Sequence, residues 1–372
     1  METVEIIDSP SVKSIEHLKT AKQGYIFGAS ASAQEVKDYL MDQGIECVGI
    51  FDNAKEKIGH DFLGLPVLSP LELKDAVKES SRVVIASAYQ DAIYSQLVEE
   101  LQVDSNKVYP YVSSMFAPHF DDESLEYLRQ KRSWLASKLA DKCSMDYFNQ
   151  LLAYRSTLDP KVLHGNARQR GFYRYENTQA FPIPGDVIID LGAFDGDTAR
   201  YYLDALDGRC RVIAVEANPI NFKALLEWSC RKEFAGKIIA LNRLVGQFDG
   251  KTCMRLKSNS LDPKSNCFEK RGDTVQCKQE RLDTLVNSLY LQSVDYIKMD
   301  IEGGEEEALL GASKTIQTYY PNMAIAAYHK PNDIVDLIEV IESIDSGYQF
   351  FLGHHPMAKY EVEIYCVHSK RV

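Results

Sequence analysis

A carboxylate and two glycines lie close together in residues 186–198, which read DVIIDLGAFDGDT. Asp190 ends an apolar run, and Gly192 and Gly196 follow it in the spacing D-x-G-x-x-x-G. A dinucleotide-binding turn has instead the spacing G-x-G-x-x-G, which lets backbone N–H groups approach a pyrophosphate. Because the carboxylate of Asp190 would repel a pyrophosphate, the spacing favours a ligand that carries an ammonium group and no phosphate near the turn.

A second acidic residue, Glu216, ends the apolar stretch CRVIAVE, 26 residues after Asp190. An acidic side chain at the end of a second strand is placed to accept hydrogen bonds from both hydroxyls of a ribose. A ribose at one end and an amino acid at the other describe S-adenosylmethionine. The residues expected to contact this cofactor lie in these two loops and at the end of a third strand, where an amide could reach the adenine: Asp190, Gly192, Ala193, Phe194, Gly196, Asp197, Thr198, Glu216, Ala217, Asn218 and Asn242. The alternative is a solvated acidic turn in an unrelated α/β protein.

A third group of charged residues lies within the stretch VDYIKMDIEGGEEEALLGA. Lys298, Asp300 and Glu302 alternate with apolar residues, so we expect the three charged side chains to share one face at the end of a strand. Burying such charges without a use is costly, which favours a polar cleft lined by a lysine and carboxylates. The later stretch NMAIAAYHK is read as a strand ending at His329, in line with the same edge.

The elements that position these residues alternate between strand and helix from Gly185 onward. Asp197 and Thr198 are expected to cap the helix that follows the first strand, and Pro219 suits the first turn of the next helix. Residues 250–277 are read as excursions between strands, and residues 280–289 as a helix. Residues 348–368 predict an antiparallel hairpin whose loop contains His354 and His355, read as loop residues and not as ligands.

The first part of the chain predicts a smaller α/β domain, in which residues 24–53 read as strand, glycine turn, helix and strand. Gly28, Ser30 and Ala33 occupy the three positions of the dinucleotide fingerprint, so a full NAD site is not expected. IFGAS, VGIFDN and GLPVL resemble the small nucleotide-sugar-binding Rossmann domains found at the front of some sugar acyltransferases and methyltransferases. That resemblance makes Gly28, Ser30 and Asp52 candidates for holding a nucleotide or nucleotide-sugar. The alternative is a scaffold that lost its ligand.

Helical spacing between residues 121 and 170 predicts helices that bridge the two α/β domains. The following residues, 164–185, are rich in Arg, Tyr and Asn, and such a loop could lie over the active site. Tyr173 and Tyr175 are read as packing residues rather than substrate contacts. The expected domains are residues 1–115, a bridge at 116–180, and residues 181–372.

Composition limits the classes of partner. The net charge of −12 and the pI near 5.2 argue against nucleic acid or an anionic membrane. The first residues, METVEIIDSP, lack the features of a signal peptide, and no run reaches about 18 apolar residues, so we expect a cytoplasmic protein without a membrane span. The 8 cysteines contain no C-x-x-C pair and are read as reduced thiols. A homo-oligomer is compatible with the sequence.

Four motifs in order, DLGAFDGDTAR, VEANP, IKMDIEGGEEEALLGA and AYHK, resemble the FkbM family of S-adenosylmethionine-dependent methyltransferases over residues 181–367. The resemblance implies a class I, Rossmann-like, seven-stranded methyltransferase fold and methyl transfer to an oxygen, often a hydroxyl of a sugar or polyketide. By position it implies that Asp300, Glu302 and His329 are active-site groups, with Lys298 beside them. A glycan precursor is the substrate suggested by the front domain.

The chemistry expected of this site is an in-line transfer of methyl to a hydroxyl whose proton a general base removes. His329 is the first candidate base, because imidazole titrates near neutral pH, and Asp300 is the second. Asp300 and Glu302 could instead hold a divalent cation, but two acidic residues on one turn do not define an octahedral site, so no metal is expected. Replacing Asp190 by Ala is expected to abolish cofactor binding with little effect on the melting temperature. The competing classes are a dehydrogenase that uses the front domain and a non-catalytic assembly protein with a retired methyltransferase fold.

Overall fold

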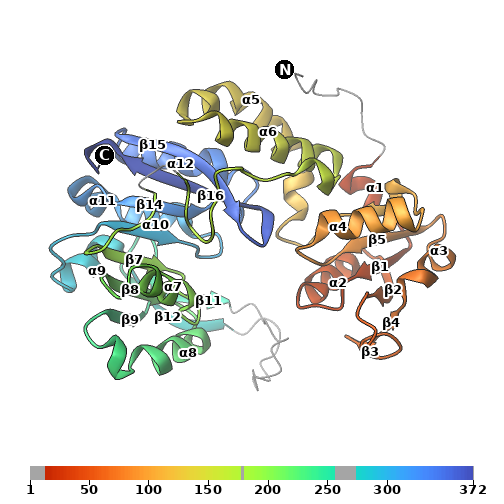
Figure 1. Cartoon of the computed structure of the whole chain (residues 1–372), viewed down its shortest axis with the longest axis horizontal. Coiled ribbons are helices and arrows are strands. Elements are labelled where there is room, and N and C mark those ends of the chain that lie inside the picture. The colour runs from red at the N-terminus through yellow and green to blue at the C-terminus, as the bar shows by residue number, and fades with distance from the viewer. Residues whose placement is uncertain (1–12, 177–179, 256–273, 372) are drawn as a thin grey trace.

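The structure is a computed structural model that describes residues 13–176, 180–255 and 274–371, without the side chains of Arg255 and Thr274. The sequence METVEIIDSP, Cys267 and most of the predicted excursion at 250–277 lie outside the described residues. Two α/β parts lie apart in the view of Figure 1, and a pair of helices lies beside the C-terminal one.

The N-terminal part is a six-stranded sheet with helices. Its strands lie in the order β3-β4-β2-β1-β5-β6, parallel except for the β3–β4 pair. Its elements are α1 (Ile15–Lys19), β1 (Gln23–Phe27), α2 (Ser32–Asp42), β2 (Glu46–Phe51), β3 (Asp61–Phe62), β4 (Leu65–Leu68), α3 (Leu73–Ala76), β5 (Ser81–Ile85), α4 (Gln90–Ser95) and β6 (Val108–Tyr109). The strand, turn, helix and strand predicted for residues 24–53 are confirmed as β1, α2 and β2.

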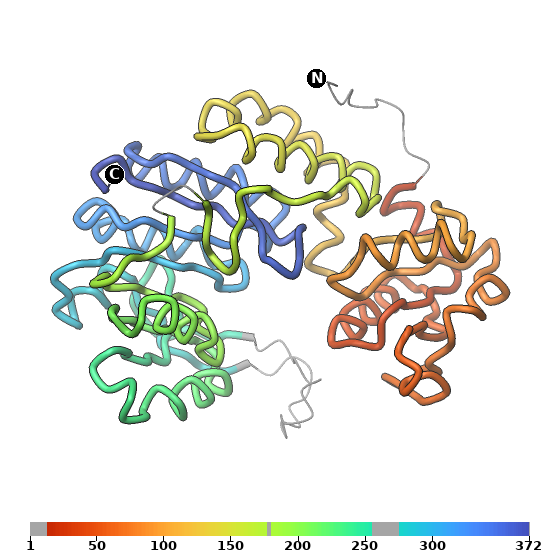
Figure 2. The backbone as a smooth tube through the Cα atoms, in the orientation of Figure 1, coloured from red at the N-terminus to blue at the C-terminus, as the bar shows by residue number. Residues whose placement is uncertain are grey.

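Two antiparallel helices form the bridge, α5 (Asp122–Lys138) and α6 (Lys142–Thr157). Asp121 and Asp141 begin them, because each carboxylate accepts a hydrogen bond from a backbone N–H of the first turn. Figure 2 shows that the backbone after α6 runs back across the C-terminal strands. The bridge therefore covers part of the C-terminal domain as well as linking it to the first sheet.

Polar contacts attach α5 to the last long helix, α12 (Asp333–Ile344). Lys131 pairs with Glu339 at 2.5 Å, and the hydroxyl of Tyr127 donates to Asp336 at 2.7 Å. These contacts place the bridge on one side of the C-terminal sheet.

The C-terminal part is built on a seven-stranded sheet in the order β15-β16-β14-β13-β7-β8-β9. The strands from β14 to β9 are parallel, and β15 and β16 close one side as an antiparallel pair. The seven-stranded sheet implied by the family resemblance is confirmed. Its elements are β7 (Val187–Leu191), α7 (Asp197–Ala205), β8 (Arg211–Glu216), α8 (Pro219–Ser229), β9 (Ile238–Asn242), α9 (Leu282–Ser288), β13 (Tyr296–Met299), α10 (Glu305–Gly311), α11 (Ser313–Tyr319), β14 (Asn322–Ala326), β15 (Tyr348–His355) and β16 (Ala358–His368).

The central strands are apolar on both faces because helices cover both sides of the sheet. Ile188, Ile189, Ile297 and Met299 are fully buried. Since β7, β8, β9, β13 and β14 are parallel, the loops that follow them meet at one edge, and the predicted site residues follow those strands.

Several local expectations were wrong. Gly196, with φ +89°, is the N-cap of α7, so Asp197 and Thr198 are its first residues and do not cap it. The strand β14 ends at Ala326, which leaves His329 in the loop beyond it. His354 and His355 belong to the end of β15 rather than to the hairpin loop.

The region read as an excursion carries its own small sheet. β10 (Leu244–Val245), β11 (Gly250–Arg255) and β12 (Thr274–Glu280) lie in the order β10-β12-β11, with β11 and β12 antiparallel. In the parts of the chain that the structure describes, no helix combines the length and the apolar character that a membrane crossing requires.

Candidate functional site

The loops that follow β7, β8 and β13 form the candidate site, and each contains a predicted residue that the structure places at the expected end of its strand. Two of them also contain a residue with left-handed backbone, Phe194 with φ +49° and Glu302 with φ +60°. Such backbone is uncommon outside glycine and is found at tight functional turns.

Asp190 is completely buried. One of its carboxylate oxygens lies 3.2 Å from Nζ of Lys298, whose side chain is 2% exposed, and the two residues are register partners on β7 and β13. Lys298 also donates to the carbonyl of Gly192 at 2.8 Å. Burial disfavours both charges and raises the pKa of Asp190, whereas the neighbouring carboxylates of Asp190 and Asp300 outweigh burial and raise the pKa of Lys298. Asp190 therefore acts on the turn through Lys298.

Glu216 is the acidic residue that the sequence placed at the end of β8, and it is 8% exposed. Its two oxygens accept hydrogen bonds from the backbone N–H groups of Phe194 and Asn218, each at 2.8 Å. The side chain of Asn221 is a further hydrogen-bond partner. Since two carboxylate oxygens offer about four lone-pair sites, the group can still accept a hydroxyl donor. The amide nitrogen of Asn242 donates to the carbonyls of Glu216 and Ala217, at 2.9 and 3.1 Å. Asn242 therefore fixes the loop after β8 through its amide N–H groups, and these two bonds leave its amide oxygen able to accept another donor.

Close packing explains the two glycines of the turn after β7. A Cβ on Gly192 would lie 1.7 Å from the carbonyl oxygen of Asp300, and a Cβ on Gly196 would lie 2.3 Å from the ring of Trp228. The backbone is left-handed at both positions. Gly192 thus lets the loops after β7 and β13 touch.

His329 lies in a buried acidic group. Its Nδ1 is 2.9 Å from Glu305 and its Nε2 is 3.5 Å from Asp300, with 2% of the side chain exposed. Burial lowers the pKa of His329, but the hydrogen bond and charge of Glu305, together with Asp300, outweigh burial and raise this pKa to about 9. His329 is therefore a cation near neutral pH, which makes it a poor proton acceptor in this state.

Asp300 is the carboxylate of this group that reaches solvent, with 23% of its side chain exposed. The hydroxyl of Tyr173 donates to one of its oxygens at 3.2 Å, and that of Tyr328 donates to the other at 3.4 Å. Tyr328 stacks at 6.4 Å on Phe116, which belongs to the segment between the two domains. Asp300 is thus held on both oxygens and remains open on one side.

Glu302 does not share this position. The left-handed backbone at Glu302 turns its side chain outward, where it is exposed. Glu305 takes the inner place instead: it is 1% exposed and accepts the backbone N–H groups of Ile301 and Gly303, at 3.0 and 3.4 Å. The expectation that Lys298, Asp300 and Glu302 share one face is therefore wrong.

Two further acidic residues near the site were not singled out from the sequence. Burial and the charge of Asp300 raise the pKa of Glu361 and of Glu363, on β16, to about 8. Their alternation in the stretch YEVEIY was a signal that both point to the same face of a strand.

A metal ion has possible ligands here. Asp300, Glu305 and His329 each offer one ligand atom, and these atoms all lie within 4.8 Å of one another. A metal ion binds a ring nitrogen of histidine only when that nitrogen carries no proton, so a doubly protonated His329 and a metal-bound His329 exclude each other.

The predicted nucleotide site of the first domain is closed by its own residues. The oxygens of Asp52 accept the backbone N–H groups of Ala29 and Ala54, each at 2.8 Å, and pair with Lys57 at 3.1 Å. The hydroxyl of Ser30 donates to a backbone carbonyl, and a Cβ on Gly28 would lie 2.7 Å from the same carbonyl oxygen, that of Ala86. Lys57 would have to move before a ribose could reach Asp52, and nucleotide binding there stays a prediction.

Comparison with known families assigns both parts of the chain. Residues 190–350 match the profile of the methyltransferase FkbM domain, and residues 21–109 match the profile described as C2185-like, N-terminal. No curated protein is a significant match to the chain.

Among solved structures, one supports the fold of the whole chain. The crystal structure of the methyltransferase FkbM from Methylobacillus flagellatus KT has a TM-score of 0.70 at 20% identity, covering 95% of this chain and 92% of that chain. The Aeropyrum pernix fibrillarin in complex with natively bound S-adenosyl-L-methionine has a TM-score of 0.32 at 18% identity, covering 49% of this chain and 66% of that chain. The UDP-D-quinovosamine 4-dehydrogenase from Vibrio fischeri has a TM-score of 0.21 at 20% identity, covering 26% of this chain and 82% of that chain. The first of these shares the fold over nearly the whole of both chains.

Proposed function

Because residues 190–350 form a methyltransferase domain of the FkbM family, we propose that the chain is an S-adenosylmethionine-dependent O-methyltransferase that acts on a hydroxyl of a sugar or glycan precursor. The observation that carries the proposal is the meeting of three loops at one sheet edge. These loops bring Glu216, a ribose acceptor, and Asp300, a solvent-reaching carboxylate, to the same side of the domain.

The loops after β7 and β8 fit the cofactor through a hydrogen-bond acceptor for its ribose. The carboxylate of Glu216 can accept the ribose hydroxyls, and the backbone N–H of Phe194, whose side chain is exposed, holds that carboxylate from the loop after β7. The ammonium partner proposed from the sequence, Asp190, reaches the cofactor only through Lys298 and the Gly192 carbonyl. S-adenosylmethionine supplies a methyl group on a sulfonium, which is already a good leaving group, so the chain's own residues have to orient the acceptor and take its proton.

Asp300 is the proposed general base. The hydroxyl oxygen of the acceptor attacks the methyl carbon, the carbon–sulfur bond breaks with its electron pair staying on sulfur, and the hydroxyl proton passes to a carboxylate oxygen. His329 was the first candidate from the sequence, but the carboxylates of Glu305 and Asp300 keep it protonated near pH 7. We therefore assign His329 to holding Asp300, and Asp300 to accepting the proton.

A sugar acceptor is supported by an exposed aromatic ring that neighbours Tyr173 in the chain. Phe172, which precedes Tyr173, is 40% exposed, and its ring lies edge-on to His355 with centroids 5.1 Å apart. Exposed aromatic rings give the apolar C–H face of a pyranose a surface on which to pack. The carboxylates nearby give its hydroxyl groups acceptors.

The proposal is tested by methyl transfer from labelled S-adenosylmethionine to a panel of sugars, sugar nucleotides and lipid-linked glycans, with wild type and Asp300→Asn. Loss of a general base lowers kcat by about a hundredfold or more, while the affinity for S-adenosylhomocysteine stays within twofold of wild type. Glu306→Gln, at an exposed position of α10, is the matched control and keeps the wild-type rate. An Asp300→Asn variant with wild-type kcat would remove Asp300 from the mechanism.

A further inference from the structure

Tyr173 lies in the segment between the helical bridge and β7, outside the three loops of the site, yet it reaches the centre of it. The residue is 5% exposed, and its hydroxyl donates to Asp300 at 3.2 Å. Nζ of Lys298 lies 5.3 Å from the centre of its ring. The ring therefore stands between the buried Lys298–Asp190 pair and the proposed base, and touches both.

The backbone at this residue is held in an unfavourable conformation. Tyr173 has φ +47°, and its carbonyl accepts a hydrogen bond from the hydroxyl of Tyr296 at 3.3 Å. A left-handed conformation in a bulky residue is unfavourable and persists only where the surroundings enforce it.

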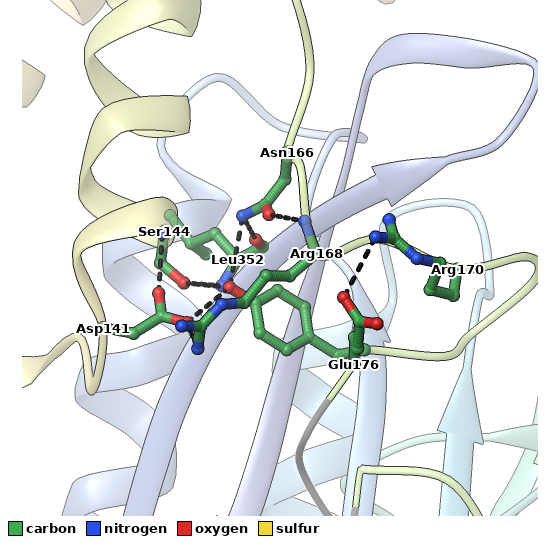
Figure 3. A network of polar contacts seen from close by, with 8 residues as sticks. Asp141, Ser144, Asn166, Arg168, Arg170, Glu176 and Leu352 are labelled. Atoms are coloured by element: carbon green, nitrogen blue, oxygen red, sulfur yellow. Dashed lines mark hydrogen bonds and ion pairs between the residues drawn. The ribbon is translucent and has the colours of Figure 1, made fainter.

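A polar network enforces the path of the segment, as Figure 3 shows. Asn166 donates to the carbonyl of Leu352 on β15 at 2.6 Å, and Arg168 pairs with Asp141 at the start of α6 at 3.1 Å. Arg170 pairs with Glu176 at 3.0 Å, on the other side of Tyr173.

Tyr175 joins the same network from the far side of the segment. Its hydroxyl donates to Asp141 at 2.7 Å and lies 3.2 Å from the hydroxyl of Ser144. The segment is thus fixed to both α6 and β15 on either side of Tyr173, which sets where the Tyr173 ring can go.

We propose that Tyr173 is a positioning residue for the methyl-transfer reaction, which orients the carboxylate of Asp300 by donating a hydrogen bond to it from the segment between α6 and β7. This corrects the reading of Tyr173 as a packing residue and rests on the proposed role of Asp300 as general base. Burial and the charge of Asp300 raise the pKa of the Tyr173 hydroxyl well above its usual range, so it stays a donor at all working pH values.

The test compares Tyr173→Phe with Tyr175→Phe. Tyr173→Phe keeps the ring over Lys298 and removes only the donor to Asp300, so kcat falls about tenfold, as expected for one hydrogen bond to a charged group. The KM for the acceptor stays within twofold of wild type, because the ring keeps its place over Lys298. Tyr175→Phe removes a hydroxyl of the same segment that bonds Asp141, so it lowers the melting temperature and leaves kcat within twofold of wild type.

Isothermal titration with S-adenosylhomocysteine separates failure of this inference from failure of the proposed function. Binding by wild type and by Tyr173→Phe within twofold of each other, with a tenfold fall in kcat for Tyr173→Phe and none for Tyr175→Phe, supports the positioning role. Equal binding with a kcat of Tyr173→Phe within twofold of wild type overturns it. No binding by wild type overturns the proposed function, and the inference falls with it.

Discussion

Replacing Asp190 by Ala tests whether Asp190 and Lys298 act as one buried pair. In this variant the ammonium of Lys298 loses its carboxylate partner but keeps its hydrogen bond to the Gly192 carbonyl at 2.8 Å. The Lys298 side chain is 2% exposed, so water cannot replace the lost carboxylate. Removing one partner of a buried ion pair costs about 3–5 kcal/mol, because the other charge stays desolvated without compensation. For a domain of this size each kcal/mol lowers the melting temperature by about 2–4 °C, so the expected loss is roughly 6–20 °C.

The double variant Asp190→Leu with Lys298→Met is the decisive comparison. It removes both charges and fills the space with apolar groups, a change that is close to neutral for stability in buried pairs. Thermal unfolding of the full chain without ligand, for wild type, Asp190→Leu, Lys298→Met and the double variant, gives the coupling free energy by a double-mutant cycle. Asp190→Ala with an unchanged melting temperature would refute the reasoning. A double variant less stable than either single variant would refute it too. The sequence alone led to the opposite expectation for stability, because it placed Asp190 against the ligand.

Three further predictions concern the proton on His329, the metal and the front domain. The pKa of His329 is raised from 6.5 to about 9, so the protonated side chain stabilises the folded state fully below pH 6.5, and this stabilisation is lost as pH rises to about 9. In urea unfolding at several pH values, His329→Gln should therefore remove about 3 kcal/mol of the pH dependence of the unfolding free energy. Dialysis against EDTA should leave methyl transfer unchanged, and a loss that Mg²⁺ or Mn²⁺ restores would show that a metal and not a proton occupies His329. Titration with NADH should leave its fluorescence unchanged, and an enhancement that saturates would revive the dehydrogenase reading of the first domain.

The parts of the site that sequence could predict are those set within one loop. A run of β-branched residues that ends on an acidic residue and a glycine turn specifies a strand and its loop, so Glu216 and Asp300 were found at the ends of β8 and β13. The order of these motifs along the chain was enough for the parallel sheet, since parallel strands bring their carboxyl ends to one edge.

Contacts across strands could not be read in the same way. Asp190 and Lys298 meet because they are register partners on β7 and β13, and register depends on the packing of the whole sheet. The alternation that placed Glu302 beside Asp300 holds only while the backbone is extended, and β13 ends at Met299. Beyond that point the left-handed turn at Glu302 sends its side chain to solvent and brings Glu305 to His329.

The sequence predicted that residues 164–185 could form a loop over the active site, but not which contacts hold that loop. Because these residues lack periodicity, the pattern did not specify the path of the backbone. The path depends on side-chain pairs distant in the chain, such as Asn166 with Leu352 and Arg168 with Asp141, which fix Tyr173 over the site.

The measurement that tests the central claim most directly is isothermal titration of the purified chain with S-adenosylmethionine and S-adenosylhomocysteine, for wild type and Glu216→Ala. We expect the wild-type chain to bind both ligands at one site with micromolar affinity. We also expect Glu216→Ala to weaken binding at least tenfold, because the ribose hydroxyls lose a charged acceptor. No heat of binding with either ligand, or an unchanged affinity in Glu216→Ala, would contradict the assignment of the cofactor to these loops.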